Sequence, residues 1–121
     1  MKIETLDPTT PLLHQFQQKD GPITLINTFV VPPDLYDAFI EVWKDDAGYM
    51  KASRGCIRTQ LHRGTAGSRL VVNVAVWEST EALLAAFSTP EFQASAARYP
   101  EGIVAYPHVF QPVAVDGICV A

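Results

Sequence analysis

The sequence predicts an α+β domain in which one four-stranded antiparallel sheet is built from elements in the order strand, helix, strand, strand, helix, strand. Apolar, β-branched segments alternate along the chain with segments whose apolar residues recur every three or four positions, which separates strands from amphipathic helices. Two of the strand segments, 23–31 and 69–77, are apolar at both parities, so both of their faces should be buried. The order βαββαβ is the ferredoxin-like arrangement, in which the helices cover one face of the sheet.

Composition limits the classes of function. The chain has 121 residues, of which 48% are hydrophobic and 18% charged, as in a globular domain. Its 9 basic and 13 acidic residues give a net charge of -4 without a basic cluster, which argues against nucleic acid as a partner. No apolar run approaches the roughly 18 residues of a spanning helix, and the first residues lack the apolar core of a signal peptide. We therefore expect no membrane partner and a cytoplasmic location.

Residues 1–22 are predicted to form an N-terminal arm that precedes the domain proper at 23–121. Three prolines interrupt this segment, and its apolar residues follow no clear period. Leu12, Leu13 and Phe16 suit either one helical turn or a strap on the surface of a partner. The sequence leaves these two alternatives open.

The first predicted strand is the segment 23–31, ITLINTFVV, and the first long helix follows it. Pro33 suits the first turn of this helix, and Asp34 and Asp37 complement the positive end of its dipole. The apolar stripe of the helix covers about four turns. Its members are Leu35, Ala38, Phe39, Val42, Trp43, Ala47 and Met50. Arg54 and Gly55 end the helix.

The next two strands, 56–63 and 69–77, are predicted to form a hairpin around the turn GTAGS at 64–68. The two glycines of this turn have the wrong spacing for a phosphate-binding loop or a dinucleotide fingerprint. A hairpin turn is therefore the preferred interpretation of the segment.

The second helical region begins after Ser79, a suitable N-cap, and its apolar stripe ends at Phe87. Pro90 ends or restarts this helix, and residues 92–98 are predicted to form a second short helix. The last strand is predicted at 103–115 and contains two prolines. Proline donates no hydrogen bond to a sheet, so this strand should lie at an edge or contain a bulge.

The second face of the sheet needs a cover that the predicted helices do not supply. The simplest cover is a second copy of the chain, packed sheet to sheet around a two-fold axis, so we expect a homodimer. The alternative is that the arm and the irregular last strand cover this face.

Metal and hydrolytic chemistry have no support in the sequence. His14, His62 and His108 are far apart, and no closely spaced set of histidine, cysteine or carboxylate side chains accompanies them. The pattern GxSxG of a serine nucleophile is also missing. The two cysteines, Cys56 and Cys119, are expected to be free thiols.

Two asparagines, Asn27 and Asn73, interrupt the apolar strands. A buried amide must be hydrogen-bonded, so each bonds either neighbouring protein groups or a ligand. Asn73 and Trp77 point to the same face of one strand, about 13 Å apart. This span suits a flat polycyclic molecule lying along the sheet, although Trp77 equally suits the core.

The stretch VNVAVWESTEALLAAFSTPEFQ at 72–93, with ITLINTFVV and GCIRTQLHR, resembles the antibiotic biosynthesis monooxygenase family. The resemblance covers most of residues 22–115 and is most specific in the pattern N-x-x-x-W-x-S-x-x-A. It implies the ferredoxin-like fold paired into a dimeric α+β barrel. Members of the family include cofactor-free oxygenases that convert anthrones to quinones, oxygenases that use reduced flavin, quinol monooxygenases and haem-degrading enzymes.

The resemblance implies a small monooxygenase that oxidises an aromatic phenol, anthrone or quinol with O2, without a cofactor or with reduced flavin. Asn73 and Trp77 match the functional asparagine and tryptophan of the anthrone oxygenases. Haem-degrading members place their iron-ligating histidine where this chain has Ala96, so haem is not expected. The substrate-binding candidates are Asn27, Phe39, Trp43, His62 and Arg98. Arg98 would offset the charge of an anionic substrate, or it is a solvated surface residue. The alternative function is a non-catalytic or cyclase-like binding protein of the same fold.

Overall fold

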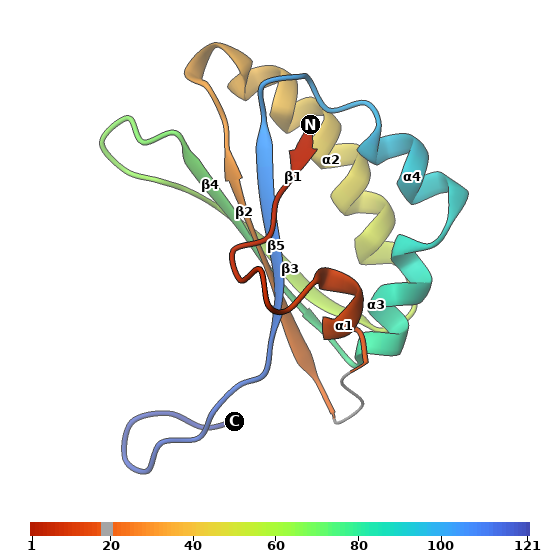
Figure 1. Cartoon of the computed structure of the whole chain (residues 1–121), viewed down its shortest axis with the longest axis vertical. Coiled ribbons are helices and arrows are strands. Elements are labelled where there is room, and N and C mark those ends of the chain that lie inside the picture. The colour runs from red at the N-terminus through yellow and green to blue at the C-terminus, as the bar shows by residue number, and fades with distance from the viewer. Residues whose placement is uncertain (18–20) are drawn as a thin grey trace.

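The computed structural model describes residues 1–17 and 21–121, and it consists of one sheet with the helices on one side (Figure 1). The strands are β1 (Lys2–Ile3), β2 (Ile23–Val30), β3 (Cys56–Arg63), β4 (Leu70–Trp77) and β5 (Val104–Phe110). The helices are α1 (Leu12–Gln15), α2 (Tyr36–Ala52), α3 (Thr80–Phe87) and α4 (Pro90–Ala96), and the short 3-10 helix η1 (Pro33–Leu35) leads into α2. The predicted α+β class and ferredoxin-like order are confirmed. None of the described helices is long and apolar enough to cross a membrane.

The sheet has five strands in the order β1-β5-β2-β4-β3, where four were predicted. The four predicted strands pair antiparallel, whereas β1 pairs parallel with β5 through Lys2 and Val104. The sequence prediction missed β1 because a two-residue strand is too short to show a period. Only its position beside the edge of β5 makes it a strand.

The last strand is shorter than the predicted segment 103–115, since β5 ends at Phe110 and Pro112 lies beyond it. Pro107 lies within β5, past the two residues that pair with β1. Beyond these two residues, β5 has a described strand, β2, on one side only, so it is an edge strand there. The missing N–H group of Pro107 therefore costs no hydrogen bond to a strand on the outer side. The predicted edge position is therefore confirmed for this part of the strand.

The N-terminal arm packs on the helical side of the sheet. Of the two alternatives for its apolar residues, the structure shows the helical turn, α1. The Phe16 ring after α1 meets the Phe87 ring of α3 edge-on at 5.8 Å, and the Gln15 side chain accepts a hydrogen bond from the Val109 amide of β5. Residues 18–20 of the predicted arm lie outside the described residues.

Local side-chain chemistry positions the helices. The Ser79 hydroxyl accepts the Ala82 amide at 3.1 Å, which confirms the predicted N-cap of α3. Thr89 caps α4 in the same way by accepting the Phe92 amide at 3.2 Å. At the start of β3, Gly55 has φ +91°, and a Cβ there would lie 2.5 Å from the Cβ of Ala82. Only glycine therefore permits this approach between β3 and α3.

The two faces of the sheet differ in their cover. Facing the helices, Ile23, Leu25, Val71 and Ala75 are buried. On the opposite face, which we call the open face, apolar side chains remain half-buried or exposed, and no described element packs over them. They are Ile26, Val30, Leu70, Val72, Val74, Val76 and Phe110. The alternative that the arm and the last segment cover this face is wrong: the arm lies with the helices, and residues after β5 extend away from the sheet (Figure 1).

Candidate functional site

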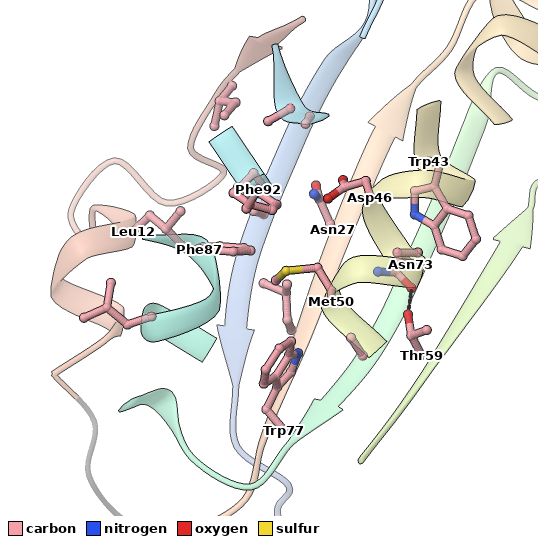
Figure 2. A pocket seen from close by; sticks show the side chains of 18 of the residues that line it. Leu12, Asn27, Trp43, Asp46, Met50, Thr59, Asn73, Trp77, Phe87 and Phe92 are labelled. Carbon is pink, nitrogen blue, oxygen red and sulfur yellow. Dashed lines mark hydrogen bonds between the residues drawn. The ribbon is translucent and has the colours of Figure 1, made fainter. Parts of the chain in front are cut away.

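A pocket of about 340 Å³ lies between the sheet and the helices, and every helix and strand described contributes to its wall, apart from the 3-10 helix. Most of the wall is apolar or aromatic, including the rings of Phe87 and Phe92, which stack at 4.6 Å. The polar groups of the wall are few (Figure 2). They belong to Asn27, Asp46, Thr59, Asn73, Trp77, Ser88, Gln93 and Tyr99. An apolar cavity with a few convergent polar groups is typical of a small-molecule site.

Strand register brings the two predicted asparagines together. Asn27 on β2 lies directly opposite Asn73 on β4, and both side chains line the pocket. The Asn73 Oδ1 atom accepts a hydrogen bond from the Thr59 hydroxyl of β3 at 2.7 Å (Figure 2). This bond orients the Asn73 amide, so its NH2 group is the end that can donate to a ligand. Thr59 is a site residue that the sequence analysis did not identify.

Trp77 closes one end of the pocket wall on β4 and has only 1% of its surface exposed. Its indole Nε1 atom is buried and has no hydrogen-bond acceptor among the described residues. A buried N–H group without a partner is rare in folded proteins. The Trp77 indole is therefore a donor available to a bound molecule.

Two acceptor atoms in the pocket are also unpaired. The Oδ1 atom of Asn27 and the Oδ1 atom of Asp46 are buried and have no hydrogen-bond partner among the described residues. With the Trp77 indole, three buried polar atoms of one pocket wall thus lack partners within the described chain. Such a concentration in one cavity indicates that a ligand or water completes the hydrogen bonding.

Asp46 is the one carboxylate among the described lining residues, and the sequence analysis missed it. Its Oδ2 atom accepts a hydrogen bond from the Tyr99 hydroxyl at 2.7 Å. Burial raises the pKa of Asp46 above its usual value, against a smaller opposing effect of the Tyr99 hydrogen bond. Burial and the neighbouring carboxylate also raise the pKa of Tyr99, so its hydroxyl remains protonated and donates. The signal in the sequence was the helical spacing of Asp46, which is seven residues after Phe39 and four before Met50 on the apolar stripe.

Three of the predicted substrate-binding residues do not line the pocket, whereas Asn27 and Trp43 do. Phe39 is fully buried in the neighbouring core, with its ring 4.9 Å from the Phe29 ring. His62 of β3 is exposed. It lies opposite Val72 of β4, so its side chain is on the open face. Arg98 lies two residues beyond the end of α4, where it forms an exposed ion pair with Asp45 at 3.1 Å. Phe39 thus belongs to the core, and His62 and Arg98 lie at the surface.

Side chains of the types that bind metal ions do not cluster within the described part of the chain. Within residues 1–17 and 21–121, no group of three or more histidine, cysteine, aspartate or glutamate side chains could hold one. Ala96, the position where the resemblance would require an iron-ligating histidine, lines the pocket. The lining residues described contain no histidine, lysine or arginine. Cys56 at the start of β3 is a free thiol whose pKa is raised by burial.

Residues 22–98 match the sequence profile of a family described as antibiotic biosynthesis monooxygenase. No curated protein sequence matches the chain significantly. Among solved structures, one from Shewanella loihica PV-4, described as a candidate monooxygenase, is 31% identical, covers 79% of this chain and 99% of its own, and has a TM-score of 0.62.

Two further solved structures are similar. SnoaB, a cofactor-independent oxygenase from Streptomyces nogalater, has a TM-score of 0.73 at 22% identity, over 81% of this chain and 99% of its own. A candidate antibiotic biosynthesis monooxygenase from Chloroflexus aurantiacus J-10-fl has a TM-score of 0.64 at 25% identity, over 81% and 99%. At 22% identity, the likeness to SnoaB concerns the fold.

Proposed function

We propose that this chain, which belongs to the antibiotic biosynthesis monooxygenase family, oxidises a small aromatic phenol, anthrone or quinol with O2. The observation that carries the proposal is the unpaired indole N–H of Trp77 in an apolar pocket that Asn73 shares. A donor of this kind stabilises negative charge that develops on a substrate oxygen, and it is most effective where water is excluded.

The reaction would begin with loss of an acidic proton from the bound substrate. The electron-rich anion transfers one electron to O2, and the two radicals combine to a peroxide that loses water. The protein then has three tasks, namely to bind the flat ring system, to stabilise its anionic oxygen and to keep bulk water away. The aromatic wall around Phe87 and Phe92 serves the first and third tasks, and Asn73 and Trp77 serve the second.

The lining residues favour a cofactor-independent reaction. A flavin nucleotide carries phosphate, which lysine, arginine or a helix N-terminus would ordinarily meet. The described lining has no lysine or arginine to meet a phosphate group. SnoaB, with the same fold, is a cofactor-independent oxygenase. Haem does not fit, since Ala96 offers no ligand to iron.

The proposed active unit is a homodimer. The open face carries a continuous apolar surface across the centre of the sheet, where Ile26 of β2 lies opposite Val74 of β4. Apolar sheet faces of this kind are stable when two of them pack against each other. A second copy would bury this surface without touching the pocket, which lies on the other side of the sheet.

The test is O2 uptake by the purified protein with a panel of anthrones and dihydroxynaphthalenes, with and without reduced flavin. We expect uptake without flavin, accompanied by formation of the quinone. Uptake only with reduced flavin would refute the cofactor-independent reaction. No uptake in either condition, together with tight binding of the same compounds, would favour a binding or cyclase-like protein instead.

A further inference from the structure

We propose that Asp46 is the general base of this pocket and that its Oδ1 atom takes the proton from a hydroxyl group of the bound substrate. The inference rests on the proposed function, because it assigns the first step of that reaction to a residue. It also specifies the substrate as an aromatic molecule with a hydroxyl group at one end and an acceptor oxygen at the other.

The geometry of the Asp46 carboxylate leaves one oxygen for a ligand. Its Oδ2 atom is held by the Tyr99 hydroxyl at 2.7 Å, whereas the buried Oδ1 atom has no partner among the described residues. Figure 2 shows the carboxylate projecting from α2 into the space above β2, the strand that carries Asn27. A general base must lie within hydrogen-bond reach of the proton that it takes, and an anchored carboxylate with one free oxygen in the pocket suits this task.

Tyr99 is a positioning residue for this carboxylate. Its ring is buried, with 5% of its surface exposed, and lies 5.6 Å from the Phe39 ring in the core. The ring therefore has little freedom to move, and neither does the hydroxyl that it carries. Phe39, expected from the sequence to touch substrate, instead supports the residue that orients Asp46.

The number of buried charges favours Asp46 over a water molecule as the acceptor of the proton. In the proposed step the substrate O–H bond breaks, the proton binds Oδ1 and the electron pair stays on the substrate oxygen. The negative charge moves from Asp46 to the substrate, so the pocket holds one buried charge before and after the step. After O2 has added, the same proton passes from Asp46 to the peroxide anion, which regenerates the carboxylate. The neutral hydroperoxide then loses water to give the quinone. The sum is substrate plus O2 giving the quinone plus H2O.

Few other titratable groups face Asp46. Tyr99, in the loop after α4, donates its hydroxyl to Asp46, and Cys56 of β3 and Met1 belong to the lining of the same pocket. On the same helix, Asp45 is turned to solvent and paired with Arg98. Burial raises the pKa of Asp46, which brings the carboxylate closer to the pKa of the phenol that it would deprotonate and makes it a stronger base.

The unpaired atoms define the complementary substrate. Oδ1 of Asp46 and Oδ1 of Asn27 are acceptors, so they require hydroxyl groups, whereas the Trp77 indole requires an acceptor oxygen. In a conjugated ring system, the negative charge left by deprotonation at Asp46 is shared with that acceptor oxygen, which the indole stabilises. Trp77 pairs with Ile23, four residues before Asn27 on β2, so the backbone positions that carry the two ends are about 13 Å apart along the strand. A hydroxylated ring system of about three fused rings with a carbonyl group spans this distance.

Binding provides a test that does not depend on turnover. The probes are 2-hydroxyanthraquinone and 2-methoxyanthraquinone, which differ by the hydroxyl donor, and tryptophan fluorescence reports binding. We expect the wild type to prefer the hydroxyl probe by about tenfold or more, since a hydrogen bond to a charged group is worth about 1.5–3 kcal/mol. Asp46→Asn should lose this preference. The matched control Asp45→Asn, one residue away and exposed, should keep it.

Turnover provides the second test. With a hydroxyanthrone, Asp46→Asn should lower kcat by about a hundredfold or more. It should also abolish the loss of kcat/KM on the acid side. Tyr99→Phe should keep the base but move this acid limb to higher pH, because the hydroxyl no longer stabilises the carboxylate. A merely structural role of Tyr99 would leave the limb in place.

The outcomes separate the two proposals. If Asp46→Asn keeps the hydroxyl preference and the acid limb, Asp46 is not the base, even if the wild type consumes O2. If the hydroxyl preference depends on Asp46 but no hydroxyanthrone is oxidised, the oxygenase proposal fails. In that case the assignment of Asp46 as the acceptor of the ligand's hydroxyl group stands.

Discussion

Two neighbouring residue pairs on the β2–β4 ladder show how differently one sheet uses its two faces. Asn27 lies opposite Asn73 and faces the pocket, whereas the adjacent pair, Ile26 and Val74, lies on the open face. The backbone of the two pairs is the same antiparallel ladder, and only the alternation of side chains separates them. Polar atoms without partners thus lie one residue from an apolar surface that no described element covers. Substitutions can therefore be aimed at one face while the other stays intact.

The largest effect is expected on the open face. Val74→Lys would place an unpaired charge in the proposed sheet-to-sheet interface, which costs about 3–5 kcal/mol. The dissociation constant of the dimer should rise at least a hundredfold, as measured by light scattering over a dilution series.

The matched control for Val74→Lys is Ala38→Lys, which places the same side chain at an exposed position of α2. It should leave the dissociation constant of the dimer unchanged. If Val74→Lys remains dimeric at low concentration, or if the wild type is a monomer, the open face does not pair with itself.

On the covered face, Trp77→Phe keeps an aromatic ring and removes only the indole donor. We expect kcat to fall about 10- to 100-fold, since a donor to a charged oxygen contributes about 1.5–3 kcal/mol. KM should change less, because the donor acts mainly on the charge that develops during the reaction. Steady-state O2 uptake measures both constants.

The control for Trp77→Phe is Tyr106→Phe, which removes a polar atom from the open face of β5. It should leave kcat unchanged. An unchanged kcat in Trp77→Phe would remove the indole from the mechanism and return Trp77 to the core.

Asp46 should destabilise the folded protein at neutral pH. Its pKa is raised in the folded state by burial, so between the unfolded and folded pKa values the folded chain binds more protons. Its contribution to the free energy of unfolding therefore falls as the pH rises through that interval. Asp46→Asn has no carboxyl group to ionise, so it does not lose this stability as the pH rises. Its melting temperature should therefore exceed that of the wild type at neutral pH, and the two should converge in acid.

Melting curves across that pH range measure the effect, with Asp45→Asn as the exposed control. A constant difference between Asp46→Asn and the wild type at all pH values would contradict the prediction. A gain in stability with a loss of activity is the pattern expected for a functional residue.

The smallest effect is expected from Arg98→Ala, outside both faces. The Arg98 ion pair with Asp45 is exposed, and such pairs contribute about 0–1 kcal/mol. Stability should change by less than about 0.5 kcal/mol. We expect kcat to change less than about twofold, since Arg98 does not line the pocket. A larger loss of kcat would show that Arg98 reaches the substrate and would restore the role predicted from the sequence.

Much of the site followed from local pattern. The pair Asn73 and Trp77 was identified because a strand places residues four apart on one face, and both line the pocket. Asn27 was found by the same argument as a polar residue in an apolar strand. The sequence analysis did not identify Asp46, because two adjacent aspartates on a helix are usually both exposed to solvent. Thr59 was not identified because its hydrogen-bond partner, Asn73, lies on another strand.

The sequence by itself determined the α+β class, the order of the elements, the cap of α3 and the two-sided apolar character of β2 and β4. These properties depend on interactions between residues a few positions apart, which the chain displays directly. Only the tertiary structure decided that β1 joins β5, that Phe39 belongs to the core and that Asp46 lies beside Tyr99 in the pocket. These contacts join residues far apart in the sequence, and their partners are set by how the helices pack on the sheet.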